Sequence, residues 1–82
     1  MKKFHHVKVN ASNNGALLNK ALQMARLKND AALSRKLNIA PTIISKIRRG
    51  CIPVGATFAI CLHEETGMSI ADMKRILGGQ EQ

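Results

Sequence analysis

Aromatic side chains are nearly absent from this sequence, which has two Phe residues and no Tyr or Trp. Sheet-based nucleic-acid-binding folds stack bases on exposed aromatic rings, so the composition argues against those folds. The core must instead be filled by aliphatic residues. Acidic residues are also scarce, with 5 Asp or Glu against 13 Lys or Arg and a net charge of +8. This imbalance favours a polyanionic partner.

Cysteine is limited to Cys51 and Cys61, which form no Cys-x-x-Cys pair. Their spacing argues against a zinc site and against a redox motif, so we expect two free thiols in a reducing cytoplasm. No apolar run reaches the length of a membrane span, and no membrane partner is expected.

Residue patterns typical of catalysis are missing as well. Glu64 and Glu65 are adjacent carboxylates, and they suit a solvated helix face better than an acid and base pair. We find no nucleophile with a neighbouring base, no metal-ligand cluster and no phosphate-binding loop. The sequence therefore predicts a protein that is not an enzyme, with no catalytic residue, no bound metal and no cofactor.

The whole chain has 82 residues, which is enough for one domain of modest stability. Its basic residues are concentrated in the first part. Residues 1–50 hold eleven Lys or Arg and one acid, Asp30, a net charge of +10. Residues 51–82 hold two Lys or Arg and four acids, a net charge of −2. We therefore expect the polyanion to bind the first part alone.

Hydrophobic periodicity predicts an all-α domain of five helices over residues 15–78. The first helix, 15–26, has Ser12, Asn13 and Asn14 as candidate N-terminal caps. The next two helices are expected at 30–37, capped by Asn29, and from Pro41 to near Arg49. A fourth is expected over 54–66 and a fifth after a Ser69 cap, with Gly67 and Gly78–Gly79 as stops. The first helix should bury Leu18, Ala21, Leu22 and Ala25, with Leu17 and Met24 on the flanks.

Residues 33–50, LSRKLNIAPTIISKIRRG, fit a helix-turn-helix. Asn38 tolerates the left-handed conformation that a reversal needs, and Pro41 fits the first turn of a helix. On that helix the residues Ile43, Ile44 and Ile47 gather on one side. The opposite side carries Thr42, Ser45, Lys46 and Arg49. An isolated helix with such a polar face is ordinary, but the compound pattern indicates a nucleic-acid-binding motif.

The two ends of the chain are polar. We interpret residues 1–14 as a basic flexible N-terminal arm, in which Lys2 and Lys3 make weak phosphate contacts. Ordering of this arm along DNA and a short strand around Val7 and Val9 are the alternatives. Residues 79–82 form a polar tail.

These features resemble a known family, the five-helix phage repressor and Cro-like helix-turn-helix domains of bacterial and phage regulators. The resemblance covers residues 16–77 and is carried by LSRKLNIAPTIISKIRRG and by GMSIADM at 67–73. It implies a compact lambda-repressor-like bundle whose third helix enters the major groove of DNA. By position it assigns base reading to Pro41, Thr42, Ser45 and Lys46 and a backbone contact to Arg49.

Three positions depart from the family pattern. Ala40 lacks the usual capping hydroxyl or amide. Asp30 stands where a Gln often approaches phosphate, and its charge would repel that group, so we assign the phosphate contact to Lys28 and Asn29. Ile43 replaces a residue that is usually polar, and it either touches a thymine methyl or belongs to the core.

The resulting prediction is a sequence-specific double-stranded DNA-binding transcriptional regulator, a repressor, located in the cytoplasm on the bacterial nucleoid. One short helix reads few bases, so we expect a homodimer on a two-fold symmetric site. The expected dimer interface is the apolar face of the last helix, with Ile60 as the alternative patch. That face consists of Ile70, Met73, Ile76 and Leu77. An antitoxin, or another protein-interaction module that binds a toxin as its protein partner, is the alternative function.

Overall fold

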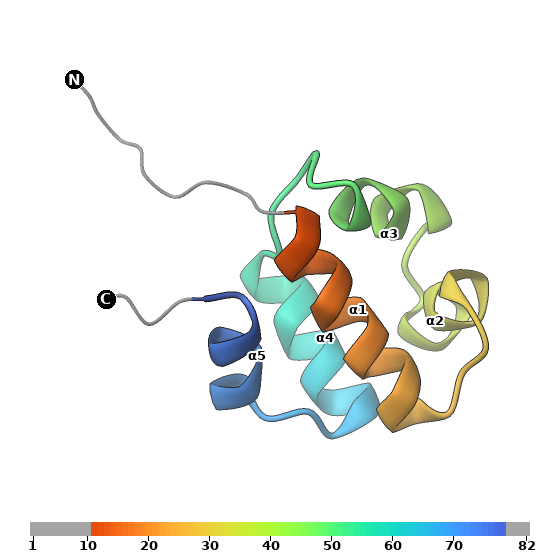
Figure 1. Cartoon of the computed structure of the whole chain (residues 1–82). Helices are drawn as coiled ribbons and strands as arrows, with labels where there is room; N and C mark the ends of the chain where they lie inside the picture. The colour runs from red at the N-terminus through yellow and green to blue at the C-terminus, as the bar shows by residue number, and fades with distance from the viewer. Residues whose placement is uncertain (1–10, 79–82) are drawn as a thin grey trace.

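The computed structural model describes residues 11–78, which fold into five α-helices without a strand (Figure 1). The helices are α1 Ala11–Ala25, α2 Asp30–Leu37, α3 Pro41–Arg48, α4 Ala56–Thr66 and α5 Ile70–Ile76. The predicted all-α class and the number of helices are confirmed. Within the described residues, no helix is both long and apolar enough to span a bilayer.

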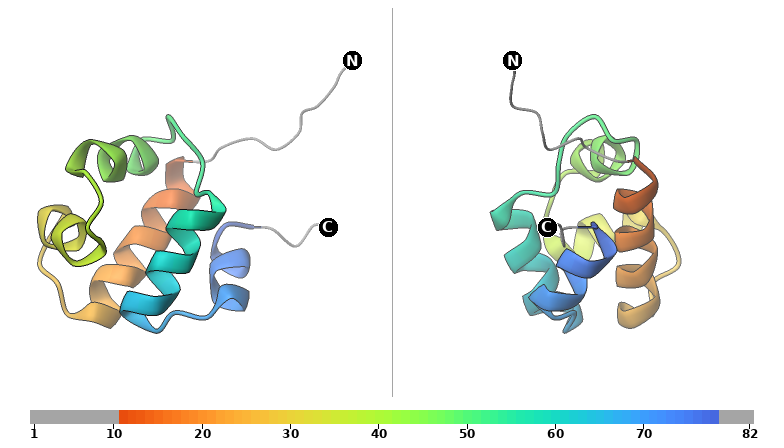
Figure 2. Two further views of the ribbon diagram at one scale, coloured as in Figure 1. Left: turned by 180° about the vertical axis from the view of Figure 1, so that it is seen from behind. Right: turned by 60° about the vertical axis from the view of Figure 1, so that its left-hand side comes forward.

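The centre of the bundle is α1, which packs against each of the other four helices. Figures 1 and 2 show α1 and α4 side by side, with α5 next to them on one side and α2 on the other. In the same views α3 lies across the end of the bundle where α1 begins. Among the described helices, α3 packs only against α1 and α2.

The core is almost entirely aliphatic, as the composition requires. Its buried members are Leu17, Leu18, Ala21, Leu33, Leu37, Ile44, Ile47, Phe58, Leu62, Met68 and Met73. Leu17, predicted on a flank of the first helix, is completely buried, whereas Met24 is 38% exposed. The buried residues of α1 form one helical stripe, Asn14, Leu17, Leu18 and Ala21, whereas Leu22 and Ala25, which were predicted to be buried, are half-buried.

Local capping signals place most of the helix ends. Asn29 Oδ1 accepts a hydrogen bond from the backbone N–H of Ala32 at 2.9 Å, and Ser69 Oγ accepts one from Asp72 at 3.0 Å. Asn38 and Gly67 adopt the left-handed conformation at the ends of α2 and α4. The predicted α2, with both of its caps, is confirmed.

The predicted start of α4 is wrong by two residues, since the helix begins at Ala56. Gly55 precedes it in an extended conformation and offers no side chain for capping. At the start of α5, the Arg75 guanidinium donates to the Asp72 carboxylate and lowers the pKa of Asp72 below its ordinary value.

The predicted start of the first helix is also wrong. The helix begins at Ala11, so Ser12, Asn13 and Asn14 lie inside it rather than capping it. Asn14 is 4% exposed, and its Nδ2 donates to the carbonyl oxygens of Ile47 at 2.8 Å and Ile52 at 3.4 Å. A long-range contact therefore uses the amide that local sequence assigns to a cap.

Close packing at the same point joins α1 to the turn after α3. Gly50 has φ +79°, and a β-carbon there would lie 2.9 Å from Cβ of Ala11. Only glycine combines this backbone conformation with so short an approach. The first turn of α1 thus holds the C-terminal end of α3.

Replacing Asn14 by Ala tests this link. We expect a loss of about 1 to 2 kcal/mol in the free energy of unfolding, because a buried amide and its hydrogen bonds disappear. Urea denaturation followed by circular dichroism measures the change. Ser12→Ala, at an exposed position of the same turn, is the control and should change stability by less than about 0.5 kcal/mol. Equal effects of the two substitutions would contradict a role for the Asn14 amide.

Candidate nucleic-acid interface

The chain reverses between α2 and α3 over three residues, 38–40. Asn38 is left-handed with φ 57° and ψ 45°, and the Ile39 N–H donates to Ser34 O at 3.0 Å. Ala40 makes no side-chain cap, in agreement with the sequence-based expectation. Pro41 is the first residue of α3, where the missing N–H costs nothing. The turn therefore places α3 next to α2 with a connection of only three residues.

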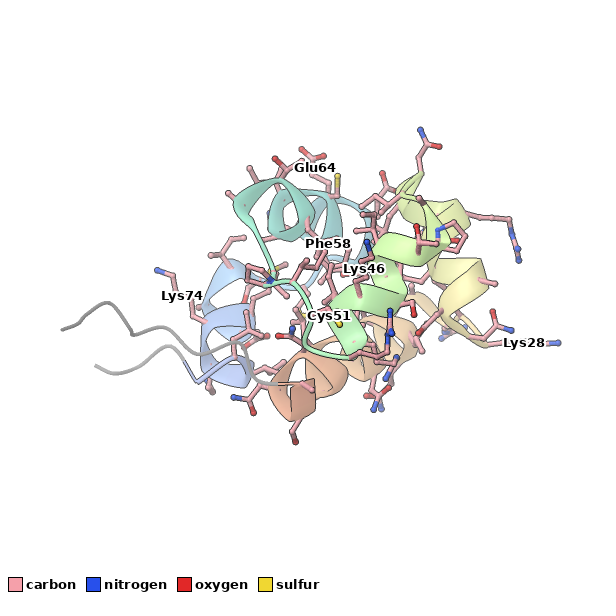
Figure 3. All side chains as sticks on the ribbon, turned by 90° about the horizontal axis from the view of Figure 1, so that it is seen from above. Lys28, Lys46, Cys51, Phe58, Glu64 and Lys74 are labelled. Atoms are coloured by element: carbon pink, nitrogen blue, oxygen red, sulfur yellow. The ribbon has the colours of Figure 1, made fainter. Side chains whose placement is uncertain are left out.

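The two sides of α3 differ as predicted, except that Ile43, which was predicted on the apolar side, is 37% exposed. Ile44 and Ile47 are 0% and 1% exposed and anchor the helix in the core. The candidate base-reading residues, Pro41, Thr42, Ser45 and Lys46, are all exposed. Lys46 lies on α3 between Lys28 and Lys74, which are near opposite ends of the molecule (Figure 3). The structure therefore gathers the base-reading candidates on one solvent-facing surface of α3.

The candidate phosphate-binding residues border this surface. Lys28 and Asn29 are exposed in the turn before α2, and Asn29 Oδ1 is used by the cap, so its amide nitrogen remains to donate. Arg49 is exposed at the end of α3, with its Nε 3.4 Å from Ser45 O. Lys2 and Lys3 lie outside the described residues.

Arg48 carries a role that sequence reasoning missed. Its Nε and Nη2 donate to the two carboxylate oxygens of Asp30 at 2.7 and 2.9 Å, and its Nη1 donates to Asn19 Oδ1 at 3.0 Å. One guanidinium thus links the end of α3 to the start of α2 and to the middle of α1. We call Arg48, Asp30 and Asn19 the clamp.

The electrostatics of the clamp are favourable at each end. A carboxylate at the start of α2 and a cation at the end of α3 both complement the helix dipoles. The hydrogen bonds to Asp30 raise the pKa of Arg48, and burial lowers it by less. The net effect is a pKa above the ordinary value. The signal that could have revealed the pair is that Asp30 is the one acid among eleven bases in residues 1–50.

The clamp changes the role that we expected for Asp30, which was to repel phosphate. Its charge is matched by Arg48, so it no longer opposes an anion near α2. The exposed bases of α2, α3 and the residues beside them have no acidic partner within residues 11–78. They are Lys28, Arg35, Lys36, Lys46 and Arg49. The exposed acids Glu64 and Glu65 lie on another helix, α4.

The predicted dimer face is only partly available. Met73 cannot belong to it, because its side chain is 2% exposed and packs inside the core of the monomer. Ile76 and Leu77 are also partly covered by that core. Most residues of this predicted face pack against the core of the same chain. Ile70, at 40% exposure, and the alternative Ile60, at 53%, remain at the surface.

Metal-ligating residues are not clustered in the described part of the chain. Residues 11–78 contain no cluster of three or more His, Cys, Asp or Glu that could hold a metal ion. Cys51 is an exposed free thiol and Cys61 a half-buried one. The surface of α3 is therefore the candidate site that the described residues support best.

A double-mutant cycle measures the clamp. With Arg48→Met and Asp30→Asn singly and together, we expect a coupling of about 1 kcal/mol, because the pair is bidentate and each side chain is only 33% exposed. The control cycle uses Arg75 and Asp72, whose side chains are 71% and 37% exposed and whose coupling should be smaller. Thermal unfolding at low and high salt supplies the data. Coupling no larger than in the control pair would show that the clamp does not hold α3.

Comparison with protein-family models, curated proteins and solved structures gives no match for this chain.

Proposed function

We propose that this chain is a sequence-specific double-stranded DNA-binding transcriptional regulator, with α2 and α3 forming a helix-turn-helix. On this proposal the bundle is of the lambda-repressor-like type, α3 enters the major groove, and the protein represses from the bacterial nucleoid. The observation that carries the proposal is the outer surface of α3. It is exposed, basic and free of acidic side chains, and none of the other described helices covers it.

The division of roles follows from the position of each side chain. Thr42 is exposed near the start of α3, and Ser45 and Lys46 are exposed near its middle, where a helix in the major groove meets base edges. Lys28 and Arg49 lie before α2 and at the end of α3, where the DNA backbone would pass. Phosphate contacts would fix the register, and the middle of α3 would read the sequence.

A homodimer on a two-fold symmetric site is part of the proposal. The eight residues of α3 span about 12 Å, enough to read only a few base pairs. Two copies supply the missing specificity, and Ile60 on α4 and Ile70 on α5 offer exposed apolar surface away from α3 for their contact. A different protein bound to that surface, such as a toxin, is the competing proposal.

Salt dependence tests both DNA binding and dimerisation. If each monomer contacts on the order of four phosphates, the log–log slope of affinity against salt should be about −7 for a dimer and about −3.6 for a monomer. Fluorescence anisotropy on a site selected from a random duplex pool gives the slope, and the selected sequences show symmetry and half-site spacing. Absence of duplex binding at low salt would refute the DNA-binding function. A monomer slope would refute the dimer alone.

Two substitutions on α3 separate base reading from backbone contact. Lys46→Ala should cost about 1 to 3 kcal/mol on the selected site and relax the choice at one base pair, because Lys can reach O6 and N7 of guanine. Arg49→Ala, the matched control one turn later, should weaken selected and scrambled duplexes equally. Titrations on both duplexes give the comparison. Equal losses for Lys46→Ala would remove Lys46 from the base-reading residues.

A further inference from the structure

Ile43 is the exposed apolar residue of α3. It is 37% exposed, while the neighbouring Ile44 and Ile47 are buried. At 100° per residue, Ile43 lies beside Lys46, three positions later, and at the border between the buried side and the polar surface of the helix. The sequence left two roles open for this side chain, and the structure places part of it on the candidate DNA-binding surface.

We propose that Ile43 reads thymine by contact with its C5-methyl group in the major groove. Thymine presents a methyl group there, and an apolar side chain is the partner that recognises it. The inference rests on the proposed function and adds Ile43 to the polar residues that read bases. The sequence preference would then combine a polar contact from Lys46 with an apolar one from Ile43.

The surroundings of Ile43 select this partner over a protein. Single exposed apolar side chains are common, and Ile60 and Ile70 are further examples. Those two lie on α4 and α5, and α4 also carries the exposed acids Glu64 and Glu65. Ile70 shares α5 with the exposed bases Lys74 and Arg75, but that helix also carries Asp72, which pairs with Arg75. Ile43 lies on α3, which carries the exposed base Lys46 and no acidic residue. A polyanion is therefore the partner whose charge matches the surface around this isoleucine.

Helix geometry also limits where the thymine lies. Three residues rise about 4.5 Å along the axis, and successive bases on one strand are about 3.4 Å apart. The thymine should therefore be about one base pair from the base that Lys46 contacts. A β-branched side chain in a helix has one strongly preferred χ1 rotamer, so the apolar contact would be fixed more sharply than the contact of a flexible lysine.

Replacing thymine by deoxyuridine removes the methyl group and leaves the hydrogen-bonding pattern unchanged. The experiment measures binding to the selected duplex with each thymine replaced in turn. The wild-type chain should lose about fourfold in affinity at one position in each half-site, the value of about one buried methyl group. Ile43→Ala should bind the thymine and deoxyuridine duplexes equally at that position. Ile60→Ala, an exposed isoleucine on α4, is the matched control and should keep the fourfold difference.

The outcomes separate the inference from the proposed function. Wild-type binding that no deoxyuridine weakens, or a fourfold difference that persists in Ile43→Ala, overturns the methyl contact while DNA binding stands. Failure of the wild-type chain to bind any duplex at low salt overturns both. Should Ile43→Ala unfold, Ile43→Val replaces it, and a difference smaller than fourfold is then expected because one carbon of the contact is lost.

Discussion

The ion pair between Arg48 and Asp30 is the polar contact that ties α3 to α2. The pair joins the last residue of α3 to the first residue of α2, and the third nitrogen of the same guanidinium reaches Asn19 on α1. At the same end of α3, the Asn14 amide donates to the carbonyl oxygen of Ile47, which also accepts the N–H of Gly50. These polar contacts are directional, so they restrain the rotation and translation of α3. The hydrophobic effect is not directional and restrains these movements less. Contacts with α1 and α2 therefore determine the direction in which the outer surface of α3 faces.

The clamp also determines the electrostatic field around that surface. Left unpaired, Asp30 would lower the positive potential near the turn before α2, where Lys28 and Asn29 lie. Pairing places the compensating charge within hydrogen-bonding distance, so the two charges largely cancel at longer range. Arg48 is thereby committed to structure, and the remaining bases of α2 and α3 create the field. The charged residues of 26–49 thus comprise one internal ion pair, Arg48 with Asp30, and a set of positively charged side chains with no acid among them.

Sequence reasoning succeeded where a feature depends on neighbouring residues and failed where it depends on distant ones. Both ends of α2 were predicted because Asn29 and Asn38 act within three or four residues of their own positions. The start of α1 was not, because Asn14 bonds a carbonyl 33 residues away instead of capping its own helix. The clamp joins residues 18 and 29 positions apart, so no local periodicity indicated it. For α5, two turns of helix could not show whether Met73 faces its own core or a second copy. The exposed polar residues of α3, by contrast, followed from helical spacing, although the 37% exposure of Ile43 did not.

The shortness of α3 explains why so many restraints gather around it. A helix of eight residues is unstable in isolation, because nucleation is costly and few hydrogen bonds repay it. Ala40, the residue before its first turn, makes no side-chain cap, so the helix's own sequence supplies little stability. Its order must therefore come from Ile44 and Ile47 in the core and from the polar contacts at its C-terminal end. The fold already orders the backbone of α3 before any partner binds. Binding to this surface therefore avoids the conformational entropy cost of ordering that helix.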